Sequence, residues 1–297
     1  MPSPALPTLG SVEVLANGEP REVPEGATVE ALIRSLGLDP RFVIVERNGE
    51  PVERARYGDV RLSPGDRLEL VRAVAGGGDV GAWRRERLAR SRLYVVTDAR
   101  RERGDLADFL EEILSAGVDL VQLREKDAEA GDLLRWAEVF REAASRHGAL
   151  FLVNDRPDVA LAAGADGVHL GQNDLPPAVA RRILGPDALV GLSCHSPEDH
   201  DLAPPEADYL TAGPIWETPT KPGRPGTGLE LVRRAARTLD RPWFAIGGIV
   251  PGNVAEVVAA GARRVVVVRA VTEAPDPAAA VRALLAGLPE PVARGAG

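Results

Sequence analysis

From residue 91 onward, short apolar runs alternate with longer stretches in which apolar residues recur at helical spacing. Continuous apolar runs of this kind are typical of buried parallel strands covered by helices. Eight such runs predict a (β/α)8 barrel, an α/β fold whose active sites lie at the carboxyl ends of the strands. A doubly wound open sheet is the alternative, although no Gly-x-Gly-x-x-Gly fingerprint follows the first run. The runs are Leu93–Thr97, Leu120–Leu123, Leu150–Val153, Gly167–Leu170, Leu189–Leu192, Tyr209–Ala212, Trp243–Ile246 and Val265–Val268.

Residues 11–75 follow a different pattern, with short alternating strands and tight turns. Two Asn-Gly pairs each predict a hairpin turn, and Thr28 is placed to cap a helix that Gly37 ends. The ββαβ…β order predicts a small ubiquitin-like β-grasp domain in front of the barrel. The expected strands are Ser11–Ala16, Glu19–Val23, Phe42–Arg47 and Arg67–Val71, and the expected helix runs from Thr28 to Leu36.

The two patterns set the expected domain boundaries. The β-grasp domain covers 11–78 and ends in three glycines, and the barrel covers 91–290. Residues 79–90 are expected to form a polar linker, with a short helix from Trp83 to Arg90. Loose tails are expected over 1–10 and 291–297.

Composition narrows the class of protein. A length of 297 residues fits about two domains, and 44% hydrophobic residues are enough for real cores. A net charge of −8 argues against nucleic-acid and anionic-membrane partners. The single cysteine, Cys194, excludes an internal disulfide and predicts a reducing, cytoplasmic setting. The first residues lack the basic and apolar regions of a signal peptide, and no window predicts a membrane span.

The end of the second predicted strand carries a cationic group of side chains. Because strand side chains alternate, Gln122, Arg124 and Lys126 point one way and Leu123 and Glu125 the other. The chain contains only two lysines, Lys126 and Lys221, and uses arginine for its other cations. Arginine and lysine are not equivalent where a compact charge is required. We therefore predict an anion-binding site at this strand end.

Two further strand ends carry acidic side chains. Asn154 and Asp155 follow the third strand, and Asp174 follows the fourth. Two carboxylates from adjacent strands can hold Mg²⁺, which commonly uses one or two carboxylates together with substrate phosphates. Either carboxylate alone also fits a helix N-cap.

The later strand ends predict a second anion site. A long loop after the sixth strand carries Thr218 and Lys221, and long loops in compact domains are usually functional or disordered. Gly247 and Gly248 follow the seventh strand and Arg269 follows the eighth, where barrels commonly bind phosphate through backbone N–H groups. Cys194 beside His195 suggests a nucleophile and base, but a structural Cys194 is the better interpretation.

The barrel resembles the thiamine-phosphate synthase family over residues 91–290. The matching motifs are Gln122-x-Arg124-Glu125-Lys126, Val153-Asn154-Asp155, Asp166-Gly167-Val168-His169-Leu170-Gly171-Gln172-x-Asp174, Gly191-x-Ser193-x-His195, Gly213-Pro214-Ile215, Thr218-x-Thr220-Lys221 and Ile246-Gly247-Gly248-Ile249. This resemblance implies a transferase that joins hydroxymethylpyrimidine diphosphate to hydroxyethylthiazole phosphate and releases pyrophosphate.

The resemblance also implies residue roles. Asp155 and Asp174 would bind the Mg²⁺ cofactor, and Arg124, Lys126 and Lys221 would be catalytic. The family often has serine where this chain has Arg269. The pyrimidine diphosphate would contact Gln122, Arg124, Glu125, Lys126, Asn154, Ser193 and Lys221, and the thiazole phosphate would contact Thr218, Thr220, Gly247, Gly248, Val268 and Arg269.

Residues 11–78 resemble the sulfur-carrier protein of thiamine biosynthesis. The matching segments are Asn17-Gly18-Glu19, Gly26-Ala27-Thr28-Val29, Leu36-Gly37-Leu38, Val45-Glu46-Arg47-Asn48, Gly65-Asp66-Arg67 and the closing glycines. In that family the last glycine ends the chain and becomes a thiocarboxylate, which implies an adenylyltransferase and a thiazole synthase as partners. In this chain Gly76-Gly77-Gly78 is followed by Asp79. Either a protease frees the glycine carboxylate, or the domain serves as a docking module.

Two rival functions remain. A related barrel is a thiazole tautomerase that uses a histidine where His195 stands, but it is not expected to keep both lysine motifs. A non-catalytic scaffold for the carrier domain would not need Lys126 or Lys221. The two motifs together favour the synthase.

Overall fold

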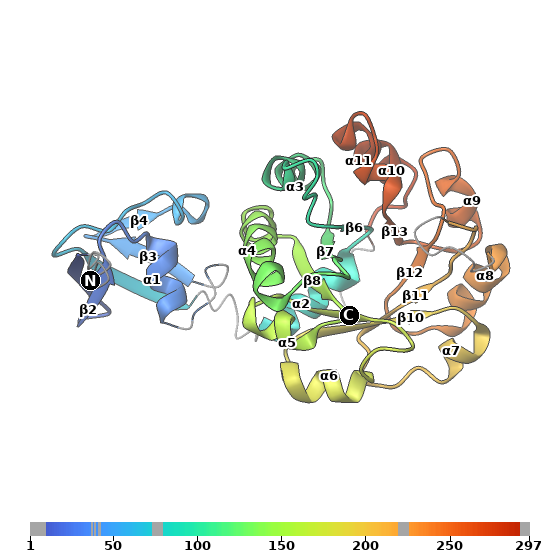
Figure 1. The fold of residues 1–297 in the computed structure, drawn as a ribbon, viewed down its shortest axis with the longest axis horizontal. Helices are drawn as coiled ribbons and strands as arrows, with labels where there is room; N and C mark the ends of the chain where they lie inside the picture. The colour runs from blue at the N-terminus through green and yellow to red at the C-terminus, as the bar shows by residue number, and fades with distance from the viewer. Residues whose placement is uncertain are drawn as a thin grey trace, which may run out of the picture. The chain divides into compact units, whose positions relative to one another are not determined.

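The computed structural model describes residues 10–36, 38, 40, 43–72, 80–218 and 226–291. The chain divides into two compact units, Met1–Gly78 and Asp79–Gly297 (Figure 1). Among the described residues, no helix combines the length and the apolar character needed to cross a membrane.

Within its described residues, the first unit has a five-stranded sheet, one α-helix and a short 3-10 helix, the arrangement of a β-grasp fold. Its strands lie in the order β2-β1-β5-β3-β4, with β1 and β5 parallel in the middle and the other pairs antiparallel. The predicted fold is confirmed, and β4 is a strand that the sequence pattern did not predict. The elements are β1 Ser11–Ala16, β2 Glu19–Pro24, α1 Val29–Ser35, β3 Val43–Arg47, β4 Glu50–Val52, the 3-10 helix η2 Arg54–Arg56, and β5 Arg67–Arg72.

Local chemistry places these elements. Asn17 and Asn48 have left-handed backbone angles, φ 52° and 55°, and each is followed by a glycine that also has positive φ, as type I′ hairpin turns require. The Thr28 hydroxyl accepts a hydrogen bond from the Ala31 N–H at 3.2 Å and so caps α1. The helix buries Leu32 and Ile33 against the sheet.

The second unit is a closed barrel of eight parallel strands with helices around it (Figure 1). The strand order β10-β11-β12-β13-β6-β7-β8-β9 closes through the pairing of β9 with β10. The predicted barrel is confirmed, and the open-sheet alternative is wrong. The strands are β6 Leu93–Thr97, β7 Leu120–Leu123, β8 Leu150–Asn154, β9 Gly167–Leu170, β10 Leu189–Cys194, β11 Tyr209–Ala212, β12 Trp243–Ile246 and β13 Val265–Val267. The helices are α2 Val80–Arg90, α3 Leu106–Ser115, α4 Ala130–His147, α5 Pro157–Ala162, α6 Pro177–Leu184, α7 Pro197–Asp201, α8 Gly228–Thr238, α9 Val254–Ala259, α10 Arg269–Thr272 and α11 Pro277–Ala286.

Alternation along the strands gives the barrel two apolar layers. One set of strand side chains packs outward against the helices. The other set fills the interior and includes Tyr94, Tyr209 and Phe244, each at most 1% exposed. The interior is therefore a packed core, and space for substrates is left only at its rim.

The short helix expected from Trp83 to Arg90 is confirmed and begins earlier, at Val80, as helix α2. The expected polar linker at 79–90 is wrong, because α2 packs at the amino-terminal end of the barrel. Leu88 is buried with the interior side chains, and Trp83 packs against the same cluster. The segment looked polar because of its arginines, but these pair with aspartates that precede the strands. Arg84 contacts Asp166 at 2.9 Å, and Arg85 lies 3.5 Å from Asp208.

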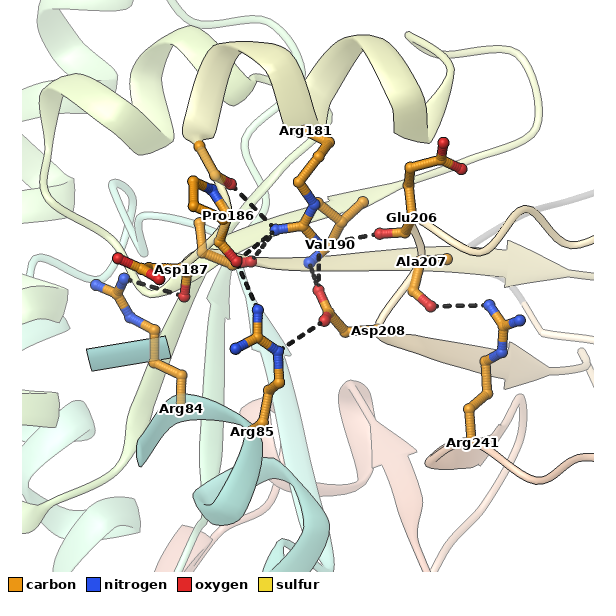
Figure 2. Close-up of polar contacts among 12 residues, drawn as sticks. Arg84, Arg85, Arg181, Pro186, Asp187, Val190, Glu206, Ala207, Asp208 and Arg241 are labelled. Atoms are coloured by element: carbon orange, nitrogen blue, oxygen red, sulfur yellow. Dashed lines mark hydrogen bonds and ion pairs between the residues drawn. The ribbon is translucent and has the colours of Figure 1, made fainter. Parts of the chain in front are cut away.

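The same aspartates also fix the strands. Asp208 accepts the Val190 backbone N–H at 2.8 Å and pairs with Arg181 of α6 as well as with Arg85 (Figure 2). Asp166 in the same way accepts the Phe151 N–H at 2.9 Å. Each carboxylate therefore links a neighbouring strand to a helix, and α2 is an integral part of the second unit.

We expect Arg84→Ala to lower the free energy of unfolding by roughly 3 kcal/mol, because Asp166 is 1% exposed and its buried carboxylate would lose the arginine that pairs with it from α2. The matched control is Arg90→Ala, whose partner Glu86 is solvent-exposed, and it should cost less than about 1 kcal/mol. Urea denaturation measures both. Equal losses of unfolding free energy in the two variants would contradict the view that α2 stabilises the amino-terminal end of the barrel.

Candidate active site

A pocket at the carboxyl ends of the strands contains most of the predicted diphosphate site. Its wall comes from the ends of β7, β8, β9 and β10. The predicted residues that line it are Gln122, Arg124, Lys126, Asn154, Asp155, Asp174 and Ser193. Four consecutive strands thus bring together side chains that are far apart in the sequence.

Alternation at the end of β7 selects which side chains enter this pocket. Gln122, Arg124 and Lys126 line it, whereas Leu123 is buried in the outer core. Glu125 points elsewhere: its carboxylate accepts the Ala99 N–H at 3.3 Å and lines a separate polar depression. The structure therefore does not place Glu125 with the predicted substrate contacts.

Asp155 and Asp174 form a carboxylate pair at one side of the pocket. Burial and the neighbouring Asp174 carboxylate raise the pKa of Asp155 to about 6, although Asn154 and Lys126 oppose the shift. Asp155 has φ 61°, a conformation that non-glycine residues rarely adopt outside functional or tightly constrained sites. Asp174 is held by the Gly171 N–H, which donates to its carboxylate at 2.7 Å.

The capping alternative for these aspartates is wrong. Arg156 is the N-cap residue of α5 and Pro176 that of α6, and neither makes a side-chain cap. Hard oxygen ligands, with a second carboxylate that raises the pKa of Asp155, suit a divalent cation. Within the described parts of the chain, no group of three or more His, Cys, Asp or Glu side chains could hold a metal ion, so water or substrate oxygens would complete the coordination.

A second pocket lies at the ends of β12 and β13. Its lining includes Thr218, Gly247, Gly248, Val268 and Arg269. Gly247 has φ 105°, and a Cβ atom there would lie 2.5 Å from the Pro214 Cα, so only glycine fits.

The backbone of the second pocket supplies its hydrogen-bond donors. Arg269 and Ala270 are the first residues of α10, and first-turn N–H groups have no acceptor within their helix. The Arg269 guanidinium turns to Glu273 on its own helix, 3.8 Å away, and is largely exposed. The Arg269 guanidinium is therefore directed along its own helix.

The two pockets adjoin. Ser193, Thr211, Ile246, Val266 and Val268 line both of them. The shared wall is mostly apolar, with two hydroxyl groups. The Thr211 hydroxyl is buried, and within the described chain it has no hydrogen-bond partner.

Cys194 and His195 do not form a nucleophile and base. Burial raises the pKa of the Cys194 thiol to about 12, and its sulfur contacts the Asp199 carbonyl at 3.6 Å. The His195 Nδ1 lies 2.6 Å from the Gly213 carbonyl oxygen. Thr220 and Lys221, expected on the phosphate side and in catalysis, lie outside the described residues.

Three polar side chains at inward strand positions were not predicted as part of the site. Tyr94 accepts a hydrogen bond from the Gln122 amide at 2.6 Å. Tyr209 contacts His169, whose other ring nitrogen lies 3.0 Å from the Ser193 hydroxyl. All three stand in otherwise apolar strands, which is the signal in the sequence for Tyr94 and Tyr209, whereas His169 also lies within one of the quoted family motifs.

Sequence comparison agrees with this geometry. Residues 93–271 match the family model described as thiamine monophosphate synthase, and residues 14–77 match the ThiS family model. A thiamine-phosphate synthase from Acidothermus cellulolyticus is 57% identical over 204 residues, which cover 68% of this chain and 96% of that protein. One from Streptomyces avermitilis is 57% identical over 199 residues, 66% of this chain and 93% of that protein.

A solved structure leads to the same family. The thiamine phosphate pyrophosphorylase from Pyrococcus furiosus superposes with a TM-score of 0.61 at 35% identity, covering 68% of this chain and 96% of that one. The family model spans more than half of the 297 residues. The chain therefore belongs to the thiamine monophosphate synthase family, with a ThiS-type domain in front of the barrel.

Proposed function

We propose that the barrel is a transferase that joins hydroxymethylpyrimidine diphosphate to hydroxyethylthiazole phosphate, giving thiamine phosphate and pyrophosphate. The observation that carries this proposal is the pair of adjoining pockets. One is cationic and has two carboxylates, which suits a diphosphate with a metal ion. The other is built from glycines and the start of α10, which suits a monophosphate. Their shared apolar wall leaves the two organic rings next to each other.

In the first pocket, Arg124, Lys126 and Asn154 would bind the diphosphate, with Gln122 and Ser193 on the pyrimidine. Asp155 and Asp174 would hold Mg²⁺, which supplies positive charge to the diphosphate when bound. Lys221 is assigned to the same leaving group from its motif. In the second pocket the backbone at Gly247, Gly248, Val268 and Arg269, with Thr218 and Thr220, would hold the thiazole phosphate.

The proposed reaction needs no protein nucleophile. The C–O bond to the diphosphate breaks and its electron pair leaves with pyrophosphate. The aminopyrimidine delocalises the positive charge that remains on the exocyclic carbon. The thiazole nitrogen then donates its lone pair to that carbon, so the new C–N bond forms with no proton transfer. The protein supplies positioning and charge stabilisation, which agrees with an inert Cys194.

The first unit has its own proposed role. Its β-grasp fold and its ThiS match support a sulfur carrier, with an adenylyltransferase and a thiazole synthase as partners in the cytoplasm. The glycines on which that role depends, Gly76-Gly77-Gly78, lie outside the described residues. A carrier would need the bond before Asp79 to be cut, whereas a docking module would not.

The primary test is pyrophosphate release from the two phosphorylated precursors. Arg124→Ala and Lys126→Ala should each lower turnover about 100- to 1000-fold, the cost of removing one donor to a developing charge. Arg182→Ala, on the exposed face of α6, is the charge-matched control and should behave as the wild type. Isomerisation of the thiazole phosphate without pyrophosphate release would favour the tautomerase instead.

Metal dependence gives a pH prediction. The pKa of Asp155 is raised in the folded, metal-free protein, so protonation of this carboxylate favours the folded state. This contribution to stability is fully present at pH 4 and below, and it is lost as the pH rises through about 6. Asp155→Asn should therefore be more stable than the wild type at pH 7.5 without metal, and the difference should vanish near pH 4. Thermal melts over pH 4–8 measure this.

The same melts test Mg²⁺ itself. Mg²⁺ should raise the melting temperature of the wild type at pH 7.5 but not below about pH 6, where Asp155 is protonated. It should not stabilise Asp155→Asn, whereas the surface control Asp201→Asn, which loses only a pair with Arg234, should respond normally. EDTA should abolish turnover. Full turnover in EDTA would exclude the metal role.

Thr211→Val separates stability from activity. Removing a buried hydroxyl that has no partner among the described residues should raise the free energy of unfolding of the ligand-free protein by about 1 kcal/mol. Because this hydroxyl lies on the wall shared by both pockets, pyrophosphate release should fall. A variant that is no more stable and fully active would show that the hydroxyl has another role.

A further inference from the structure

A buried chain of hydrogen bonds crosses the barrel directly below the first pocket. The Gln122 Nε2 donates to the Tyr94 hydroxyl at 2.6 Å, and that hydroxyl lies 3.3 Å from the Tyr209 hydroxyl. The chain continues from Tyr209 to the His169 Nδ1 at 2.9 Å and from the His169 Nε2 to the Ser193 hydroxyl at 3.0 Å. All five side chains are less than 9% exposed. Gln122 and Ser193, at the two ends, line the pocket, and so do Tyr94 and His169 between them.

The absence of a side chain at Gly191 gives this hydrogen-bond chain the space that it needs. Tyr209 on β11 and His169 on β9 are two strands apart, and Gly191 of β10 pairs with both in register. A Cβ atom on Gly191 would lie 2.1 Å from the Tyr209 ring. The missing side chain is what allows the Tyr209 ring to stack on His169, with centroids 5.5 Å apart.

The chain has one consistent direction. Burial raises the pKa of both tyrosines, so each keeps its single proton to donate. Tyr94 already accepts from Gln122, so its own proton is available to Tyr209, and that of Tyr209 to the His169 Nδ1. A histidine that accepts at Nδ1 carries its proton at Nε2 and donates to Ser193.

The direction decides what the pocket presents to a ligand. With its N–H₂ group held by Tyr94, the Gln122 amide has its carbonyl Oε1 left, which has no partner within the described chain. With its oxygen accepting from His169, Ser193 has its O–H left to donate. Gln122 and Ser193 thus offer the pocket an acceptor and a donor in fixed positions.

We propose that Tyr94, Tyr209 and His169 are positioning residues that hold the Gln122 carbonyl and the Ser193 hydroxyl so that the pocket selects an amino-substituted over an oxo-substituted pyrimidine. This rests on the proposed placement of the pyrimidine diphosphate in the first pocket. The exocyclic amino group donates to the Gln122 carbonyl, and a ring nitrogen accepts from Ser193. An oxo group at the same position would face the carbonyl with another acceptor.

The same arrangement favours the reaction. As the C–O bond breaks, the amino group feeds electron density into the ring and its N–H bonds become more positive. A carbonyl already fixed in place interacts more strongly with them in the transition state than in the ground state. Selection of the substrate and its activation therefore use one contact.

Loss of the chain should release the Gln122 amide. Without the Tyr94 hydroxyl, nothing opposes a half-turn about the terminal torsion of Gln122, which has two nearly equivalent states. The turned amide would present N–H₂ and accept an oxo analogue. One hydrogen bond of ordinary net strength corresponds to about tenfold in selectivity.

The test measures kcat/KM for the amino and oxo pyrimidine diphosphates, with thiazole phosphate and Mg²⁺, in full-length protein. Tyr94→Phe and Tyr209→Phe keep their rings, and each should reduce the amino-over-oxo preference about tenfold or more, with KM for the thiazole phosphate unchanged. Phe244→Leu is the control: its ring packs on both tyrosines at 5.6 Å, but it has no hydroxyl, so it should keep the preference.

The outcomes separate the two levels of the proposal. A wild type that releases no pyrophosphate with the amino substrate would refute the proposed function. An active wild type whose preference survives both Tyr→Phe changes would overturn only the positioning role. A second readout is the ¹⁵N NMR tautomer of His169, assigned with His169→Asn. We expect the Nε2–H form at pH 7.5, and an Nδ1–H form or an imidazolium would also overturn the inference.

Discussion

Closure of eight parallel strands is the constraint on which the second unit depends. The pairing of β9 with β10 leaves no free sheet edge and brings every strand to the same rim in the same direction. Residues far apart in the sequence, such as Gln122 and Thr211, therefore face one volume. The amino-terminal rim is bound together by aspartates and the arginines of α2, so the opposite rim is free to carry side chains chosen for chemistry.

One rim stabilises the barrel and the other carries the pockets, and this difference explains where the strained Asp155 backbone and the Thr211 hydroxyl, unpaired among the described residues, lie. Asp155 in a left-handed conformation and the buried Thr211 hydroxyl both destabilise the ligand-free protein. Both lie at the rim of the pockets. The apolar interior and the ion pairs at the amino-terminal rim stabilise the barrel and offset the cost of these two groups. Such a balance between scaffold and active site is common.

Periodicity predicted the barrel well because buried parallel strands are continuous apolar runs, and alternation predicted that Gln122, Arg124 and Lys126 share a face. Periodicity failed where a side-chain contact between different elements determines the structure. The arginines of α2 look like a solvated linker until their aspartate partners are seen. Glu125 is a different case: alternation pointed it away from the pocket, as the structure does, and only its motif assigned it to the substrate. Tyr94 and Tyr209 look like ordinary core aromatics, because no sequence pattern shows which hydroxyls meet across a barrel.

The presence of two compact units in one chain has a consequence for the amounts in which they are made. One message yields both domains in equal number. A cell that translates this chain therefore fixes the ratio of carrier-type domain to synthase at one to one, whatever the expression level.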